Sequence, residues 1–208
     1  MIDGPLLLAF IGAISILTIT PGVDTAIVIR SAMESRRSAG FAAIGVALGC
    51  LTWGAVVSLG LGALLHASEL AYATLKLLGA GYLVWLGCKL LLKPRNSLKM
   101  STGLKAVGAR PSFRRGFLTN ILNPKVGVFY VTFLPQFIPV RASVASYSFF
   151  LACLHVTLTL LWFAILIIAT APLIRILREP GPLRWMDRIT GGVLIAFGVK
   201  LATSSSAR

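Results

Sequence analysis

Two charged side chains stand in apolar surroundings, each shortly after a proline. Asp24 follows "TITPGV" and Lys125 follows "TNILNP". A charge inside hydrocarbon costs about 2.5 kcal/mol or more, so such residues usually face a protein interior or a water-filled cavity. A carboxylate can bind an ammonium group or carry a proton, and an ammonium can bind a carboxylate. If the fold brings the two segments together, they predict a site for a zwitterion.

Both prolines follow a residue type that often caps helices. Thr20 precedes Pro21, and Asn123 precedes Pro124. A polar cap followed by proline at the first helical position is a helix-start signature. Each segment should therefore contain a break and a second half-helix, whose free N–H groups suit a carboxylate. Gly22 is expected to allow a close approach of the backbone.

The composition of the chain places these segments in a membrane. Of 208 residues, 57% are hydrophobic and only 12% are charged, with a mean hydropathy of +0.88. A soluble domain would have about 25% charged residues. Apolar stretches recur at membrane-spanning length, about 20 residues each. These features predict an all-α polytopic membrane protein with about six transmembrane helices and no separate soluble domain. The expected spans are about 6–29, 40–65, 70–92, 117–138, 144–177 and 185–202.

The basic residues behind the net charge of +14 lie mostly in the expected loops on one side of the membrane. With six spans, 15 of the 20 basic residues fall on one side of the membrane. The positive-inside rule places that side in the cytoplasm and both termini outside. The basic loops can also contact anionic headgroups of membrane lipids. This distribution explains the charge without a nucleic-acid partner.

The chain also contains a weak internal repeat. "LTITPGVD" aligns with "NILNPKVG", and "LGCLTWG" with "LACLHVT", at an offset of 103; "GYLVWLGCKL" aligns with "GVLIAFGVKL" at an offset of 111. Three spans per half would insert the second half upside down, an arrangement typical of secondary transporters, whose sites form at broken helices. We therefore expect one transmembrane transporter domain, 1–208, with two inverted three-helix repeats and Pro-broken first and fourth spans. Repeat one covers about 4–92, a basic cytoplasmic loop 93–116, and repeat two about 117–202.

The same motifs resemble those of the LysE/RhtB family of bacterial amino-acid exporters. "TPGVDT", "LKLLGAGYLVWLGCKLL" and "GFLTNILNPKVGVFYVTFLPQFIP" carry the resemblance, which runs over nearly the whole chain. It implies a multi-pass protein of the bacterial inner membrane that exports amino acids or related metabolites, driven by the proton gradient. One departure is Val23, where the family commonly has a second proline. The family motifs carry over to Pro21, Gly22, Asp24, Asn123, Pro124 and Lys125.

The leading interpretation is a secondary transporter that exports neutral amino acids, such as threonine, homoserine or leucine, by proton antiport. A basic substrate would need further deep acidic residues, and Asp24 is the only one evident. The alternative is a CcdA-like membrane thiol–disulfide electron carrier, although Cys50 and Cys153 lie away from the two breaks. An ion channel is a third interpretation, but no filter sequence is evident. Without a nucleophile constellation or nucleotide motif, the chain is not predicted to be an enzyme or to hold a metal or cofactor. A homodimer would be compatible with the sequence.

Several roles stay open at this point. Asp24 could be a substrate ligand, a proton carrier or half of a structural ion pair with Lys125. Lys125 could instead extend to the cytoplasmic surface. His155, in the fifth span, could relay protons or be a hydrogen-bonded core imidazole. Thr52, its partner in the repeat, could line the same cavity.

Overall fold

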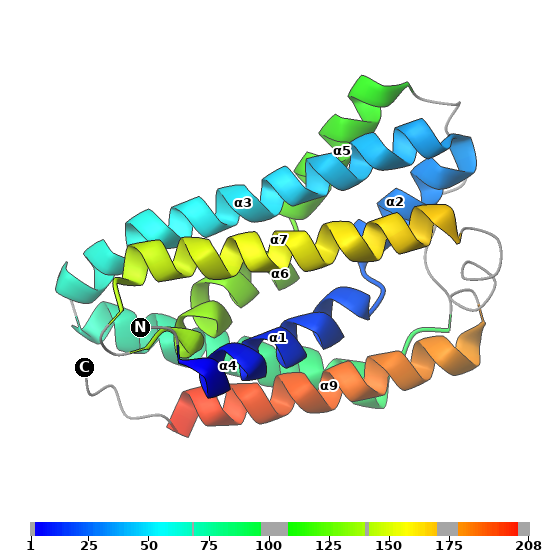
Figure 1. Cartoon of the computed structure of the whole chain (residues 1–208). Helices are drawn as coiled ribbons and strands as arrows, with labels where there is room; N and C mark the ends of the chain where they lie inside the picture. Colours follow the sequence, from blue (N-terminus) through cyan, green and yellow to red (C-terminus); the bar gives the residue numbers. More distant parts are fainter. Residues whose placement is uncertain (1–2, 68, 97–107, 140–141, 170–178, 204–208) are drawn as a thin grey trace.

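The computed structural model describes residues 3–67, 69–96, 108–139, 142–169 and 179–203, and within these ranges it is entirely helical (Figure 1). Between α6 and α7 the chain continues as a π-helical turn, η1 (Phe129–Phe133), and a 3-10 turn, η2 (Leu134–Phe137). The α-helices are α1 (Gly4–Ile19), α2 (Val23–Glu34), α3 (Arg36–Ala67), α4 (Glu69–Leu92), α5 (Ala109–Ile121), α6 (Pro124–Val128), α7 (Val144–Ile168) and α9 (Pro180–Thr203).

The helices make this a polytopic membrane protein. Among the described residues, Arg36–Gly60 of α3 and the whole of α7 are long and apolar enough to cross a membrane. Helices α1 and α2 form a third candidate if they count as one span, bent by 52° at the break between them. The break that Pro21 predicts in the first span is therefore confirmed. By length and composition the structure contains two or three spans, against the six expected.

Two groups of helices pack most extensively. Helix α3 lies along α5 and α7, and α4 lies along α9 (Figure 1). The α3–α5 contact is close because it is made by glycine: a Cβ on Gly45 would lie 2.2 Å from the backbone oxygen of Phe113. Small residues at such contacts are typical of helices in membranes, where close van der Waals packing replaces the hydrophobic effect between helices.

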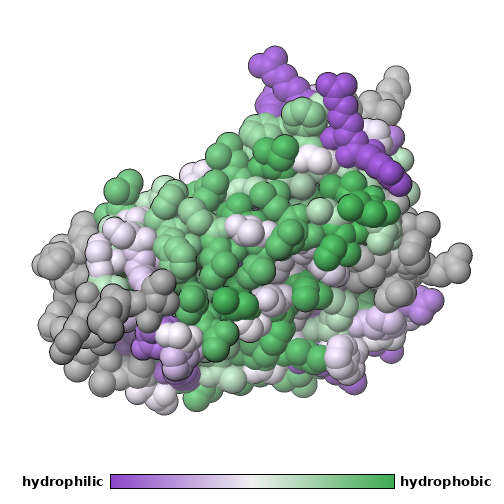
Figure 2. All heavy atoms as spheres, in the orientation of Figure 1, coloured by the Kyte–Doolittle hydropathy of each residue, from purple (hydrophilic) through white to green (hydrophobic). Residues whose placement is uncertain are grey.

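The ends of the helices gather at the two ends of the molecule, and a hydrophilic cluster marks the end where α5 begins (Figure 1, Figure 2). The start of α1, the start of α7 and the end of α9 lie at one end, and the α2–α3 junction, the end of α4 and the start of α5 at the other (Figure 1). Hydrophobic atoms cover the middle of the visible face, and a hydrophilic cluster projects at the end where α5 begins (Figure 2). The exposed Arg110 and Arg114 belong to this start of α5.

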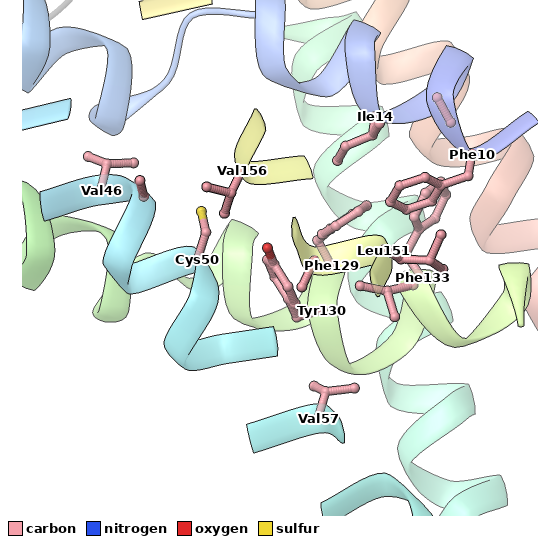
Figure 3. Packing of buried hydrophobic residues seen from close by; sticks show 14 of the residues in the cluster. Phe10, Ile14, Val46, Cys50, Val57, Phe129, Tyr130, Phe133, Leu151 and Val156 are labelled. Atoms are coloured by element: carbon pink, nitrogen blue, oxygen red, sulfur yellow. The ribbon is translucent and has the colours of Figure 1, made fainter. Parts of the chain in front are cut away.

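The main aromatic core lies where α1, η1, η2 and α7 meet (Figure 3). Phe10 of α1 meets Phe137 edge to face, with ring centroids 5.3 Å apart. Tyr130 and Leu151 are fully buried beside them. This core positions one wall of the candidate site, because Phe129 lines it and follows directly from α6, the short helix after the second break.

Several element boundaries differ from those expected. Helix α5 begins at Ala109, eight residues before the expected fourth span, so the last part of the basic connection is helical. Span estimates count only apolar residues, whereas a helix can continue beyond hydrocarbon with charged ones. The fourth span also contains the π-helical and 3-10 turns in place of continuous α-helix. Pro135 contributes to this change, because it has no N–H to donate to the preceding turn. Part of the fifth span, expected to reach 177, falls outside the described residues.

Candidate functional site

A cavity of about 60 Å³ lies where the two helix breaks meet. This volume can hold a few water molecules or a small polar group. It is bordered by the end of α1, the first turn of α2, the middle of α3, the start of α6, η1 and one face of α7. The fold therefore brings together two segments about 100 residues apart in the sequence. The lining residues are Leu17, Thr18, Thr20, Gly22, Asp24, Thr25, Val46, Cys50, Asn123, Lys125, Val126, Phe129, His155, Thr159 and Phe163.

At the first break, the chain needs three residues to turn between α1 and α2. Thr20 ends α1: its hydroxyl donates to the backbone oxygen of Ile16 at 2.7 Å and is hydrogen-bonded to Thr190 of α9. The N-cap of α2 is Gly22, which has no side chain to cap with. The prediction that Thr20 caps the second half-helix is therefore wrong, because its hydroxyl is held by α1 and α9. Pro21 is buried in the turn and does not line the cavity.

At the second break, the helix-start prediction is confirmed. Asn123 is the N-cap of α6, and its Oδ1 accepts from the backbone N–H of Lys125 at 3.1 Å. Pro124 takes the first helical position. Its side chain is exposed and borders a separate apolar groove of about 350 Å³, between α4 on one side and α3, α5, α6 and η1 on the other. Asn123 borders both spaces, so its amide separates the groove from the cavity.

Only one oxygen of the Asp24 carboxylate is hydrogen-bonded among the described residues. Its Oδ2 accepts from the side-chain amides of Asn120 at 2.9 Å and Asn123 at 3.4 Å. Its Oδ1 is buried and has no hydrogen-bond partner among the described residues. Leaving a buried charged acceptor unpaired costs at least about 1–3 kcal/mol. Oδ1 is therefore available to a donor that enters the cavity.

Lys125 borders the same cavity without pairing directly to Asp24. Within the described parts of the chain, the ion pairs are Arg95–Asp187 and Arg115–Glu34, and no hydrogen bond joins Lys125 Nζ to another side chain. The charges of Lys125 and Asp24 are close enough to interact through space. The interpretation of a direct structural ion pair is thus not supported, and one charge of each sign faces a shared space.

The two further candidates, His155 and Thr52, differ in whether they line the cavity. His155 is buried and lines the cavity from α7, and its Nδ1 lies 2.9 Å from Tyr130 Oη. Of the two roles that the sequence left open, the structure shows the hydrogen-bonded core imidazole, and this imidazole also forms part of the cavity wall. Thr52 does not line the cavity: its hydroxyl donates to the backbone oxygen of Leu48 at 2.8 Å, within its own helix. The expectation that both share one cavity is wrong for Thr52.

The most important residue missed from sequence is Asn120. It is fully buried at the end of α5, and its Nδ2 donates to both Asp24 Oδ2 and Cys50 Sγ, the latter at 3.3 Å. Gly49 makes room for it, because a Cβ there would lie 2.6 Å from Asn120 Oδ1. The available signal was a second asparagine in the otherwise apolar "TNILNP". Cys50 is part of the buried hydrophobic cluster (Figure 3), and its Sγ also accepts from Asn120 beside the cavity.

A cavity with one residue of each charge at paired helix breaks, inside a helical polytopic membrane protein, is the arrangement typical of secondary transporters. Residues 15–205 match the family described as LysE type translocators, and the chain belongs to this family. This match confirms the resemblance seen in the motifs. The family is one of transporters, which agrees with the expectation that the chain is not an enzyme.

Several relatives cover nearly the whole chain. An uncharacterized membrane protein of Bacillus subtilis, YrhP, is 33% identical over 95% of this chain and 99% of its own length. A leucine efflux protein of Klebsiella pneumoniae is 27% identical over 94% of this chain and 93% of its own. A threonine efflux protein of Salmonella typhimurium is 26% identical, over 89% and 91%. No solved structure matches the chain.

Proposed function

We propose that this protein is a secondary transporter that exports neutral amino acids, such as threonine, homoserine or leucine, from the cytoplasm in exchange for protons. The observation that carries the proposal is the pair of opposite charges at one cavity. Asp24 Oδ1 has no partner among the described residues, and within the same residues Lys125 forms no ion pair across the cavity. An amino acid presents the complementary pair, an ammonium and a carboxylate. Family membership, and relatives named for leucine and threonine efflux, support the same substrate class.

The binding mode follows from the hydrogen bonds. Asn120 and Asn123 hold Asp24 by Oδ2, which leaves Oδ1 for the substrate ammonium. Lys125 takes the substrate carboxylate. Asp24 is the only acidic residue among the described cavity-lining residues, so a second positive charge on a basic substrate would find no partner. Much of the remaining wall is apolar, which also supports a neutral side chain. Its members are Leu17, Val46, Val126, Phe129 and Phe163.

Proton exchange can use the same carboxylate. Asp24 can bind a proton or the substrate ammonium, and loading of one displaces the other. Intramembrane carboxylates commonly serve as proton carriers in transporters. Such competition for a single group gives antiport without a second coupling site.

Paired helix contacts support the proposed inverted repeat. At the offset of 111, Gly87 corresponds to Gly198 and Ala80 corresponds to Gly191. A Cβ on Gly87 would lie 2.6 Å from the Gly191 oxygen, and a Cβ on Gly198 would lie 3.0 Å from the Ala80 oxygen. These are the same contact made in both directions, as expected for two halves related by a two-fold axis. Helices α4 and α9, with 24 residues each, are also long enough to cross about 30 Å of hydrocarbon.

The same repeat gives the proposed topology. Six spans in two inverted halves would place both termini on one side and the basic ends of the helices in the cytoplasm of a bacterium, across its inner membrane. The halves would move relative to each other around the cavity to expose it alternately to the two sides. Neither the family nor the relatives above are described as thiol–disulfide carriers, so nothing favours that alternative.

The test is transport in proteoliposomes loaded with labelled amino acids, with and without an imposed pH gradient. We expect gradient-dependent transport of neutral amino acids by the wild type and its loss in Asp24→Asn. Asp3→Asn is the matched control: it makes the same change at an exposed helix cap, where asparagine caps as well as aspartate. Transport that survives Asp24→Asn would reduce Asp24 to a structural role. If the wild type transports no amino acid, the proposed function is wrong.

A further inference from the structure

Many threonine hydroxyls among the described residues bond within their own helix. Six of those that the structure describes donate to the backbone oxygen four residues earlier, at 2.7 to 3.0 Å. Such a bond satisfies the hydroxyl within its own helix, which is valuable in a membrane because no water is at hand. The six are Thr20, Thr52, Thr74, Thr132, Thr157 and Thr203.

Thr18 and Thr159 behave differently. Their Oγ1 atoms are buried and have no hydrogen-bond partner among the described residues, and both side chains line the cavity. Thr159 is only 4% exposed. A threonine in a helix has a carbonyl within reach one turn back, yet these two hydroxyls are not bonded to it. The structure thus leaves two hydroxyls unpaired at the cavity, whereas the six threonines above bond within their own helices.

The two hydroxyls come from neighbouring helices. Thr18 lies two residues before the first break, at the end of α1, and α1 packs against α7. Thr159 lies one turn beyond His155 and one turn before Phe163, so the three share one face of α7. All three line the cavity. Both hydroxyls therefore belong to the wall of the same cavity, with Thr159 between His155 and Phe163.

These polar atoms are not needed for the charged groups of an amino acid. On the proposed function, Asp24 binds the ammonium and Lys125 the carboxylate. The hydroxyls of Thr18 and Thr159 then remain for the substrate side chain. A hydroxyl can both donate and accept, so it can pair with another hydroxyl, whereas a methyl group of the same size would leave both threonines unpaired. A site built to bond a substrate hydroxyl discriminates against an analogue without it more strongly than an apolar pocket discriminates between sizes.

We propose that Thr18 and Thr159 form a hydroxyl-recognising subsite, so that this protein favours short neutral amino acids with a side-chain hydroxyl over aliphatic ones of similar size. The inference rests on the proposed function and narrows it. Leucine, which has no polar side-chain atom, is then a poor substrate. In this arrangement Thr18 and Thr159 determine which side chain is accepted. Asp24 and Lys125 bind the ammonium and carboxylate groups that all amino acids share.

The test compares threonine with valine, which replaces the hydroxyl by a methyl group at nearly the same volume. The full-length protein in proteoliposomes is assayed for kcat/KM with each substrate, for the wild type, Thr18→Val and Thr159→Val. Thr157→Val is the matched control, because Thr157 is exposed on the same helix and its hydroxyl bonds to the Cys153 oxygen at 2.9 Å. Thr159→Ser, which keeps the hydroxyl, should retain the wild-type preference.

We expect the wild type to prefer threonine by about tenfold or more. Thr18→Val and Thr159→Val should reduce this ratio severalfold by lowering threonine transport, with valine transport unchanged or raised. Thermal unfolding of the purified variants with either amino acid added gives a second readout: threonine should stabilise the wild type more than valine does, and Thr159→Val should remove the difference.

Three results would overturn the subsite. Equal kcat/KM for threonine and valine in the wild type would show no hydroxyl preference. A parallel loss of both substrates in the valine variants would show that the hydroxyls are structural. A change in Thr157→Val as large as that in Thr159→Val would show that position on α7 does not matter. In each case neutral amino acids are still transported and the proposed function stands, whereas absence of all amino-acid transport would remove both proposals.

Discussion

The Arg95–Asp187 ion pair should be strongly asymmetric in its effect on stability. Asp187 is fully buried in α9, and its carboxylate accepts from the backbone N–H of Arg95 at 2.8 Å, from Nε at 3.0 Å and from Nη2. The Arg95 side chain is 35% exposed. If Asp187 is removed, Arg95 can turn towards water. If Arg95 is removed, the carboxylate stays buried and loses the only side chain that pairs with it among the described residues.

The expected costs follow from this difference. Removing one partner of a buried ion pair and stranding the other charge costs about 3–5 kcal/mol. We expect Arg95→Ala to lower the free energy of unfolding by about 3 kcal/mol. This is the lower end of the range, because the pair is partly open to solvent on the Arg95 side. Asp187→Ala should cost about 1–2 kcal/mol, since it loses hydrogen bonds without burying a charge. The double replacement Arg95→Met with Asp187→Leu should recover much of the loss, as apolar substitutes for buried pairs often do.

The assay is a double-mutant cycle on reversible unfolding in mixed detergent–lipid micelles, with the free energy of unfolding as the readout. Arg188→Gln is a suitable control, because Arg188 is exposed one residue from Asp187 and the change removes a charge at the same end of α9. The reasoning is refuted if Asp187→Ala is as destabilising as Arg95→Ala, or if the cycle gives a coupling energy near zero.

Three more outcomes are expected. Asn120→Leu should lower kcat/KM about 10- to 100-fold, the worth of one hydrogen bond to a charged group, because the Asp24 carboxylate loses its shorter amide contact; a change below twofold would contradict this. Gly87→Ala should lower the free energy of unfolding by about 1–3 kcal/mol, since the new Cβ would lie 2.6 Å from a backbone oxygen of α9, whereas Gly81→Ala, with open space around it, should change it by less than about 0.5 kcal/mol. A variant without cysteines should still transport amino acids in the pH-gradient assay, and its inactivity would revive the thiol–disulfide alternative; the positions replaced by alanine are Cys50, Cys88 and Cys153.

Local chemistry explains what could be predicted from the sequence. Composition identifies a membrane protein because hydrocarbon excludes charge over whole segments, and the motifs identify the family. The breaks near Pro21 and Pro124 are also local, since a proline removes a backbone donor wherever the helix goes. At the second break even the cap is predicted correctly, because Asn123 bonds to the N–H of Lys125 two residues away.

Tertiary structure decided the rest. Thr20 and Asn123 look equivalent in sequence, yet the Thr20 hydroxyl bonds to Thr190, 170 residues away, and Gly22 caps α2 instead. The same holds for Asp187, a buried carboxylate that does not line the cavity and that the sequence did not single out. Asp187 stands among basic residues in "LRWMDRIT" and is buried only because Arg95 reaches it from the end of α4.

The candidate site shows the same division. The sequence by itself determined the membrane class, the family, and the positions at which two helices break, because each of these depends on composition or on neighbouring residues. Only the packing of α1, α2, α3, α5 and α7 decided that Asn120 holds Asp24 and that Thr18 and Thr159 face one cavity. A side chain's own residue type determines which bonds it can make, but its partner is determined by helices that are distant in the chain and adjacent in space.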